Sequence, residues 1–125
     1  MTSIRRSALG FAVVGVLSTL THVCVATLCI ELLGARPPVA NVVAFAVATL
    51  FSYTANTLLS FGQQLNLATA WRFGLVASAG GVVSTFMTWL VERAGGHYAL
   101  GIALVVTVIP AFSYLGHRFF TYRLR

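Results

Sequence analysis

The chain has 125 residues, of which 58% are hydrophobic and only 8% are charged. A soluble domain usually carries about 25% charged residues, because a small domain has a large surface relative to its volume. This composition therefore excludes a soluble globular domain unless the chain is enclosed in another assembly. The formal net charge is +6, but the arginines do not cluster between aromatic residues on a polar face, so we expect no nucleic-acid partner.

Four stretches of the chain are long and apolar enough to cross a membrane, which takes about 20 mostly apolar residues per helix. In chain order they cover residues 9–33, 39–61, 71–91 and 98–119. The segments between them are short and rich in Gly, Pro and side-chain amides, as is typical of turns between helices. No stretch alternates as the strands of membrane β-barrels do. The sequence predicts an all-α, polytopic membrane protein with four transmembrane helices.

Six of the eight arginines fall on one side of the predicted membrane, at the N-terminus, in the second loop and at the C-terminus: Arg5, Arg6, Arg72, Arg118, Arg123 and Arg125. Arg36 and Arg93 fall on the other side. Because segments rich in Lys and Arg stay in the cytoplasm, this asymmetry predicts that both termini are cytoplasmic.

The sequence contains an internal repeat. Residues 51–61 align with residues 112–122 at a constant offset of 61, and residues 15–19 align with residues 81–85 at an offset of 66. Each half contains two predicted helices, so both halves enter the membrane in the same direction. This predicts a parallel repeat of two helical hairpins within one domain, about residues 5–62 and about residues 68–125, related by an axis along the membrane normal.

The order and spacing of these motifs resemble the GtrA-like family of small four-helix bacterial membrane proteins. That family opens with a Phe-x-x-Val-Gly stretch, as in residues 11–15, and ends each half with a pattern close to Asn-Arg-x-Trp-Thr/Val-Phe. The residues that fit the two endings are Asn56, Ser60, Phe61, Arg118 and Thr121. The residues that depart from them are Thr57, Leu59, His117, Phe120 and Tyr122.

The resemblance covers the whole chain, residues 1–125, and implies a multi-pass protein of the bacterial cytoplasmic (inner) membrane. It implies translocation, or flipping, of a polyprenyl-phosphate-linked sugar for cell-surface polysaccharide modification. A second role stays open, that of a non-transporting scaffold or subunit of a membrane glycosyltransferase. A third hypothesis, a small multidrug-type exporter, needs a mid-membrane carboxylate in the first helix, whereas here His22 lies at mid-depth and Glu31 near the helix end.

Polar side chains within apolar spans are costly and mark candidate functional sites. The guanidinium of Arg118 can pair bidentately with a phosphate, although an arginine near a helix end can also simply extend to the lipid headgroups. Asn56 and His117 occupy equivalent positions of the repeat, with a serine one turn before each. The predicted substrate-binding residues are Arg118, His117, Asn56, Ser52, Ser113, Tyr53, Tyr114 and His22.

Three further features each have a structural and a functional interpretation. His22 can bond a hydroxyl or amide on a neighbouring helix or take part in proton transfer. Small and hydroxyl residues line one face of the first helix (Gly15, Ser18, Thr19) and of the third (Ala77, Gly81, Ser84, Thr88), which favours helix packing. An outer-side polar rim, or two ion pairs, is expected from Glu31, Arg36, Glu92 and Arg93.

The motifs of soluble enzymes are missing from the sequence. It has no Gly-rich phosphate loop, nucleophile elbow or zinc-ligand spacing, so we expect no enzymatic activity, no cofactor and no metal. Four helices packed around their own axis leave little room for a sugar headgroup. We therefore expect a homodimer or a higher oligomer, with membrane lipid and a lipid-linked sugar as partners.

Overall fold

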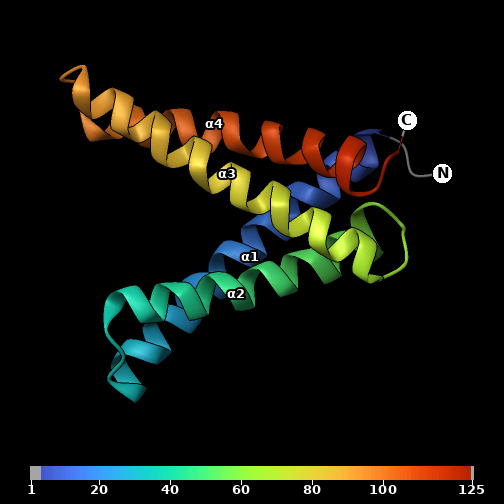
Figure 1. Ribbon diagram of the computed structural model, residues 1–125, viewed down its shortest axis with the longest axis horizontal. Helices are drawn as coiled ribbons and strands as arrows, with labels where there is room; N and C mark the ends of the chain where they lie inside the picture. Colours follow the sequence, from blue (N-terminus) through green and yellow to red (C-terminus); the bar gives the residue numbers. More distant parts are fainter. Residues whose placement is uncertain (1–3, 125) are drawn as a thin grey trace. The chain divides into compact units, whose positions relative to one another are not determined.

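The computed structural model describes residues 4–124, apart from the side chains at positions 37, 38, 98, 102 and 106. Its elements are α1 (Ile4–Leu33), α2 (Pro37–Ala55), η1 (Asn56–Ser60), α3 (Leu67–Arg93), α4 (Tyr98–Gly116) and η2 (His117–Thr121), where η1 and η2 are π-helical turns (Figure 1). The described residues form no strand. The all-α prediction is therefore confirmed.

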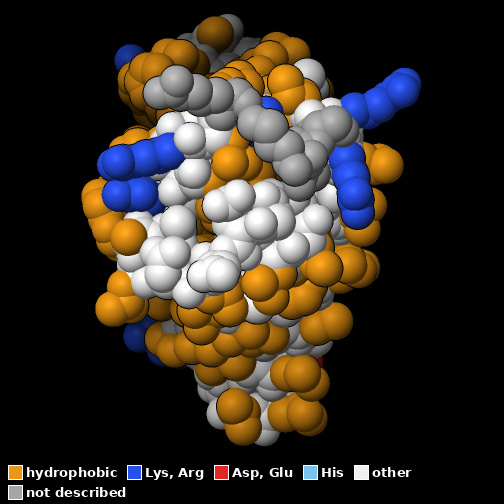
Figure 2. Space-filling model, turned by 90° about the vertical axis from the view of Figure 1, so that its right-hand side faces the viewer, with side chains coloured by type: hydrophobic (Ala, Val, Ile, Leu, Met, Phe, Trp, Pro, Cys, Tyr) orange, Lys and Arg blue, Asp and Glu red, His pale blue; other side chains and the backbone are white. Residues whose placement is uncertain are grey.

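Four helical stretches are long and apolar enough to cross a membrane, which confirms the predicted number of spans. Apolar side chains cover much of the surface in Figure 2, and most large ones on the helices are exposed, as expected of side chains that face lipid. The third helix begins at Leu67, earlier than the hydropathy pattern predicts. The physical reason is a helix cap, because the side-chain oxygen of Asn66 accepts from the backbone N–H of Thr69 at 2.9 Å.

The chain divides into two compact units, Met1–Leu65 and Asn66–Arg125, and each unit is a helical hairpin. In the first hairpin α1 packs on α2 and η1, and in the second α3 packs on α4 and η2. The two π turns, η1 and η2, begin at Asn56 and His117, which are 61 residues apart as the repeat predicts. The parallel orientation of the two halves and the cytoplasmic side of the termini stay predictions.

Small residues bring α1 and α2 together. Three alanines spaced four residues apart on α2, Ala40, Ala44 and Ala48, are buried. Alanines at this spacing form one face of a helix and let two helix backbones approach closely. The hydroxyl of Ser18 on α1 donates to the carbonyl of Ala48 at 3.0 Å. The packing interpretation of Ser18 is thus confirmed within the first hairpin.

Each hairpin ends its second helix with the same widened turn. The backbone N–H of Phe61 donates to the carbonyl of Asn56 at 2.9 Å, and that of Tyr122 donates to His117 at the same distance. These bonds span five residues, one more than in an α-helix. The repeat in the sequence therefore corresponds to a repeated π-helical turn, which hydropathy alone did not indicate.

A residue with a positive φ follows this turn in both hairpins, two positions after its last residue. It is Gly62, with a φ of 60°, in the first hairpin and Arg123, with a φ of 54°, in the second. Glycine adopts this conformation freely, whereas an L-residue with a Cβ loses about 1–2 kcal/mol. Because Arg123 adopts it nonetheless, the turn geometry is fixed by the bonds around it rather than by glycine.

We predict that Gly116→Ala destabilises the second hairpin. A Cβ at Gly116 would lie 2.9 Å from Cγ1 and 3.4 Å from Cγ2 of Val76, and a β-branched valine cannot rotate to make room. Overpacking of this kind costs about 1–3 kcal/mol. Thermal unfolding in detergent should show the loss, and Val76→Ala in the same chain should restore most of it.

Gly81→Ala is the matched control, because no atom lies within 4 Å of a Cβ built at Gly81. Because alanine has a higher helix propensity than glycine, Gly81→Ala should raise the free energy of unfolding by up to about 1 kcal/mol. A Gly116→Ala protein as stable as the Gly81→Ala protein would contradict the packing described here.

Candidate functional site

Buried polar side chains gather at the two π turns. Among the described residues, seven polar side chains are buried, and all but Ser7 lie in η1 or η2: Asn56, Thr57, Ser60, His117, Arg118 and Thr121. They occupy the first, second and fifth positions of each turn. Burial of a polar group costs free energy unless it is hydrogen-bonded, so we take these two turns as the candidate site.

In the first hairpin the amide of Asn56 is bonded at both ends. Its Nδ2 donates to Oγ of Ser52 at 3.1 Å, and its Oδ1 accepts from Oγ of Ser60 at 2.7 Å. Ser60 in turn lies against α1, because a Cβ at Gly10 would be 3.0 Å from its Oγ. The predicted neighbours Ser52 and Asn56 are therefore in contact, in a cluster that also fastens η1 to α1.

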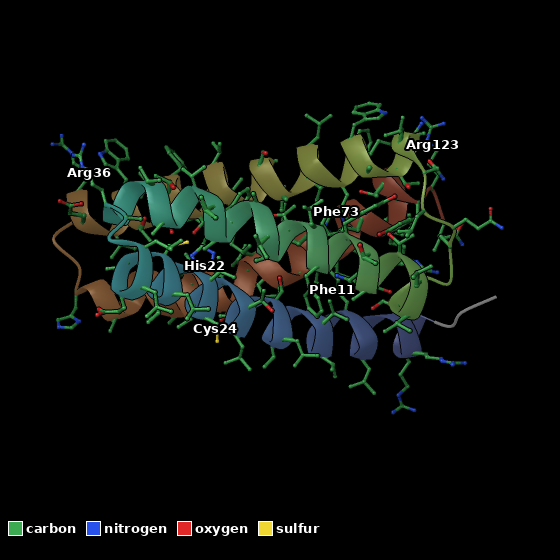
Figure 3. The ribbon with its side chains drawn as sticks, turned by 90° about the horizontal axis from the view of Figure 1, so that it is seen from below. Phe11, His22, Cys24, Arg36, Phe73 and Arg123 are labelled. Atoms are coloured by element: carbon green, nitrogen blue, oxygen red, sulfur yellow. The ribbon has the colours of Figure 1, made fainter. Side chains whose placement is uncertain are left out.

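In the second hairpin an imidazole replaces the amide. Nδ1 of His117 lies 3.0 Å from Oγ1 of Thr121, which repeats the bond between the first and fifth positions of η1. The imidazole ring stacks on the ring of Phe73 from α3, with centroids 4.0 Å apart and an angle of 9° between the planes. Figure 3 labels Phe73, which the sequence analysis did not single out.

Arg118 follows His117 and is buried, with 5% of its surface exposed. Its Nη1 lies 3.5 Å from the hydroxyl of Tyr114, the long limit of a hydrogen bond. Its guanidinium lies 5.9 Å from the ring centroid of Phe119, at the edge of cation–π range. The guanidinium thus lies near the aromatic side chains of Tyr114 on α4 and Phe119 on η2, and its charge and shape suit an anion.

The chain's two acidic residues, Glu31 and Glu92, both precede a hairpin turn. In the second hairpin the twenty helical positions between Tyr98 and Arg118 separate that turn from η2 by about 30 Å. The η2 end of this hairpin carries Arg118 and Arg123 and lies far from Glu92, so its side-chain charges favour an anionic ligand such as a phosphate.

The remaining predicted residues divide into those near the clusters and those apart from them. Ser113 lies near Gly80 of α3, where a Cβ would be 3.5 Å from its Oγ. Tyr53 is half-buried and adjacent to Ser52 on α2. Their part in ligand binding stays a prediction.

His22 lies apart from η1. Its Nε2 is 3.1 Å from Oδ1 of Asn41 on α2 (Figure 3), and the fifteen helical positions from Asn41 to Asn56 separate it from η1 by about 22 Å. The expected amide partner on a neighbouring helix is therefore present. A role of His22 in the substrate site stays a prediction.

The residues of the outer-side polar rim are exposed at the hairpin turns. The guanidinium of Arg93 lies 5.8 Å from the ring centroid of Trp89. Within the described part of the chain, Glu31 forms no ion pair with Arg36 and Glu92 forms none with Arg93. The expected ion pairs are thus not found, because long exposed side chains gain little from pairing.

The stripes of small residues do not pack within their own hairpins at every position. A Cβ built at Gly15 or at Gly81 would have no atom within 4 Å. Thr19 and Thr85 each donate to the carbonyl of the glycine four residues earlier, at 2.9 Å. Within its own hairpin, each of these two equivalent positions therefore leaves room for a larger side chain.

No group of three or more His, Cys, Asp or Glu side chains in the described residues is placed to hold a metal ion.

We predict that Asn56→Ala lowers stability by about 1–3 kcal/mol, because it leaves the buried Ser60 hydroxyl without its acceptor. Thr54→Ala is the matched control, since the exposed Thr54 bonds only the Leu50 carbonyl of its own helix and should change stability by less than about 0.5 kcal/mol. Unfolding in detergent measures both. Equal losses of unfolding free energy for the two substitutions would show that the hydrogen bonds of the buried amide do not stabilise the protein.

The His22–Asn41 bond joins two helices and is testable by a double-mutant cycle. We expect a coupling free energy of about 0.6 kcal/mol for His22→Ala and Asn41→Ala, the average for polar pairs between membrane helices. Unfolding of the two single variants and the double variant gives this value. Strictly additive effects would mean that the 3.1 Å contact does not contribute to stability.

The comparison with protein families agrees with the fold. The family model described as "GtrA/DPMS, transmembrane domain" matches residues 10–122. Searches of curated proteins and of solved structures returned no match. The match covers nearly the whole chain and includes all four spans in large part. The chain is therefore a multi-pass membrane protein that belongs to the GtrA/DPMS transmembrane family.

Proposed function

We propose that this protein translocates a polyprenyl-phosphate-linked sugar across the bacterial cytoplasmic membrane, for modification of a cell-surface glycan. Family membership supports a role with lipid-linked glycosyl groups. The observation that carries the proposal is the buried guanidinium of Arg118 at the end of α4. A side chain that merely extended to the lipid headgroups would be exposed, whereas Arg118 is buried.

In this mechanism the apolar polyprenyl tail stays in the apolar lipid throughout, so moving it across the membrane has no hydrophobic cost. The phosphate pairs with Arg118 through two charge-assisted hydrogen bonds. His117 and Tyr114 of the same hairpin lie within about one turn of Arg118, and Ser113 lies five residues before it. In this proposal all three contact the headgroup. Ser52, Tyr53, Asn56 and His22 of the first hairpin stay predicted substrate contacts.

The remaining parts of the proposal follow from charge and size. Both termini and η2 are placed in the cytoplasm, since six of eight arginines lie on that side. Four helices packed around their own axis leave little room for a sugar headgroup, so in this proposal the path needs a homodimer or a higher oligomer. The chain carries out no covalent chemistry in this proposal, and a concentration or proton gradient drives movement.

A scaffold for a membrane glycosyltransferase is the second candidate function. The observation that favours it is the pair of stripes at Gly15 and Gly81, where a built Cβ meets no described atom of its own hairpin within 4 Å. Such stripes suit docking of a partner's transmembrane helix. A scaffold binds its enzyme without moving lipid by itself.

The test uses purified protein in liposomes that contain a fluorescent short-chain polyprenyl-phosphate sugar. A membrane-impermeant quencher reports the fraction of lipid in the outer leaflet over time. We expect rapid equilibration with the wild-type protein, and a rate at least about tenfold lower for Arg118→Gln, since a hydrogen bond to a charged group contributes about 1.5–3 kcal/mol. Arg93→Gln removes the same charge at the other end of the hairpin and should keep the wild-type rate.

Two outcomes would contradict parts of the proposal. Equal rates for Arg118→Gln and Arg93→Gln, both above empty vesicles, would remove Arg118 from the path. No movement above empty vesicles with wild-type protein would favour the scaffold.

A further inference from the structure

The two π turns have the same backbone but different chemistry at one position. In both, the first and fifth side chains are buried and bonded to each other, and a residue with positive φ follows the turn. The second position is also buried in both, and it is Thr57 in η1 and Arg118 in η2. The repeat thus presents the same position twice, once with a neutral side chain and once with a cation.

In the first turn the side-chain amide of Asn56 is already occupied by hydrogen bonds within its own helix. Asn56 is fully buried, and its two ends bond Ser52 and Ser60 within the same helix. The basic residues closest to η1 in its hairpin, Arg5 and Arg6, are exposed near the start of α1. A phosphate at η1 would therefore meet no buried guanidinium.

We infer that each chain binds one polyprenyl phosphate, through η2 of the second hairpin, while η1 is a structural copy that binds none. The inference rests on the proposed function for the identity of the ligand. The shared chemistry is that of an anionic phosphate group, which a polyprenyl phosphate, a phospholipid headgroup or free phosphate could supply. Arg118 is the residue that determines where it binds, and Thr57 is the residue that excludes it from the first hairpin.

The test counts ligands per chain by native mass spectrometry of the purified full-length protein in detergent. The probe is a short-chain polyprenyl monophosphate without sugar. We expect one bound molecule per chain for the wild type, and at least a tenfold loss of affinity for Arg118→Thr, which makes η2 resemble η1. Thr57→Val is the matched control, because it changes the equivalent residue to one of similar size and should keep one bound molecule.

A further variant tests the same idea by gain of binding. Thr57→Arg should raise the count to two per chain if the protein folds. Because Thr57 is fully buried and an arginine is much larger, circular dichroism first checks that the variant folds, and a folded variant that still binds one molecule per chain would contradict the inference. Competition with phosphatidylglycerol and with inorganic phosphate separates the three sources, and we expect neither to displace the polyprenyl phosphate at equal concentration.

Several results would overturn the inference. They are two ligands per wild-type chain, no ligand at all, unchanged affinity in Arg118→Thr, or displacement by phosphatidylglycerol, which would make η2 a phospholipid site. The liposome measurement is independent of these results. One ligand at Arg118 without lipid movement would uphold this inference and reject translocation. Lipid movement with two ligands per chain would uphold translocation and reject this inference.

Discussion

In a lipid bilayer no water satisfies a backbone N–H or C=O group, so a helix must end with those groups bonded inside the protein. Both hairpins meet this constraint where the second helix ends, at Ser60 and Thr121, and both do so with a π turn. The widened turn brings the first and fifth side chains into contact, and each pair forms a hydrogen bond. The buried polar clusters are therefore part of how the helices end, and any ligand site there is built on that requirement.

Much of the fold follows from hydropathy, because an apolar stretch of about 20 residues has few alternatives to a membrane helix. Boundaries are less predictable. The predicted third span starts at residue 71, yet the helix begins at Leu67 because Asn66 caps it. The π turns were not predicted, since five residues are too few for a hydrophobic period to separate 3.6 from a wider turn. The repeated polar residues at positions one and five were the only signal for them.

Contacts within one helix could be predicted, and contacts between helices could not. Ser52 and Asn56 are one turn apart, so helical geometry alone brings them together. The bond of His22 to Asn41 and the stacking of Phe73 on His117 depend instead on how far one helix is shifted along the other. That shift is fixed by the detailed shapes of small residues such as Ala40 and Ala44, which a single sequence does not reveal.

The two hairpins also show how a duplicated element can diverge without losing its backbone. In the first, Gly10 of α1 gives room to Ser60 of η1, and in the second Gly116 of α4 gives room to Val76 of α3. At the 66-residue offset Gly10 corresponds to Val76, but at the 61-residue offset Ser60 corresponds to Thr121 and Gly116 to Ala55. The two hairpins therefore make their close helix contacts at different positions, while the backbone bonds of the turns stay the same. Because side-chain packing and backbone bonding are separable here, one copy can carry Arg118 while the other keeps only its structural part.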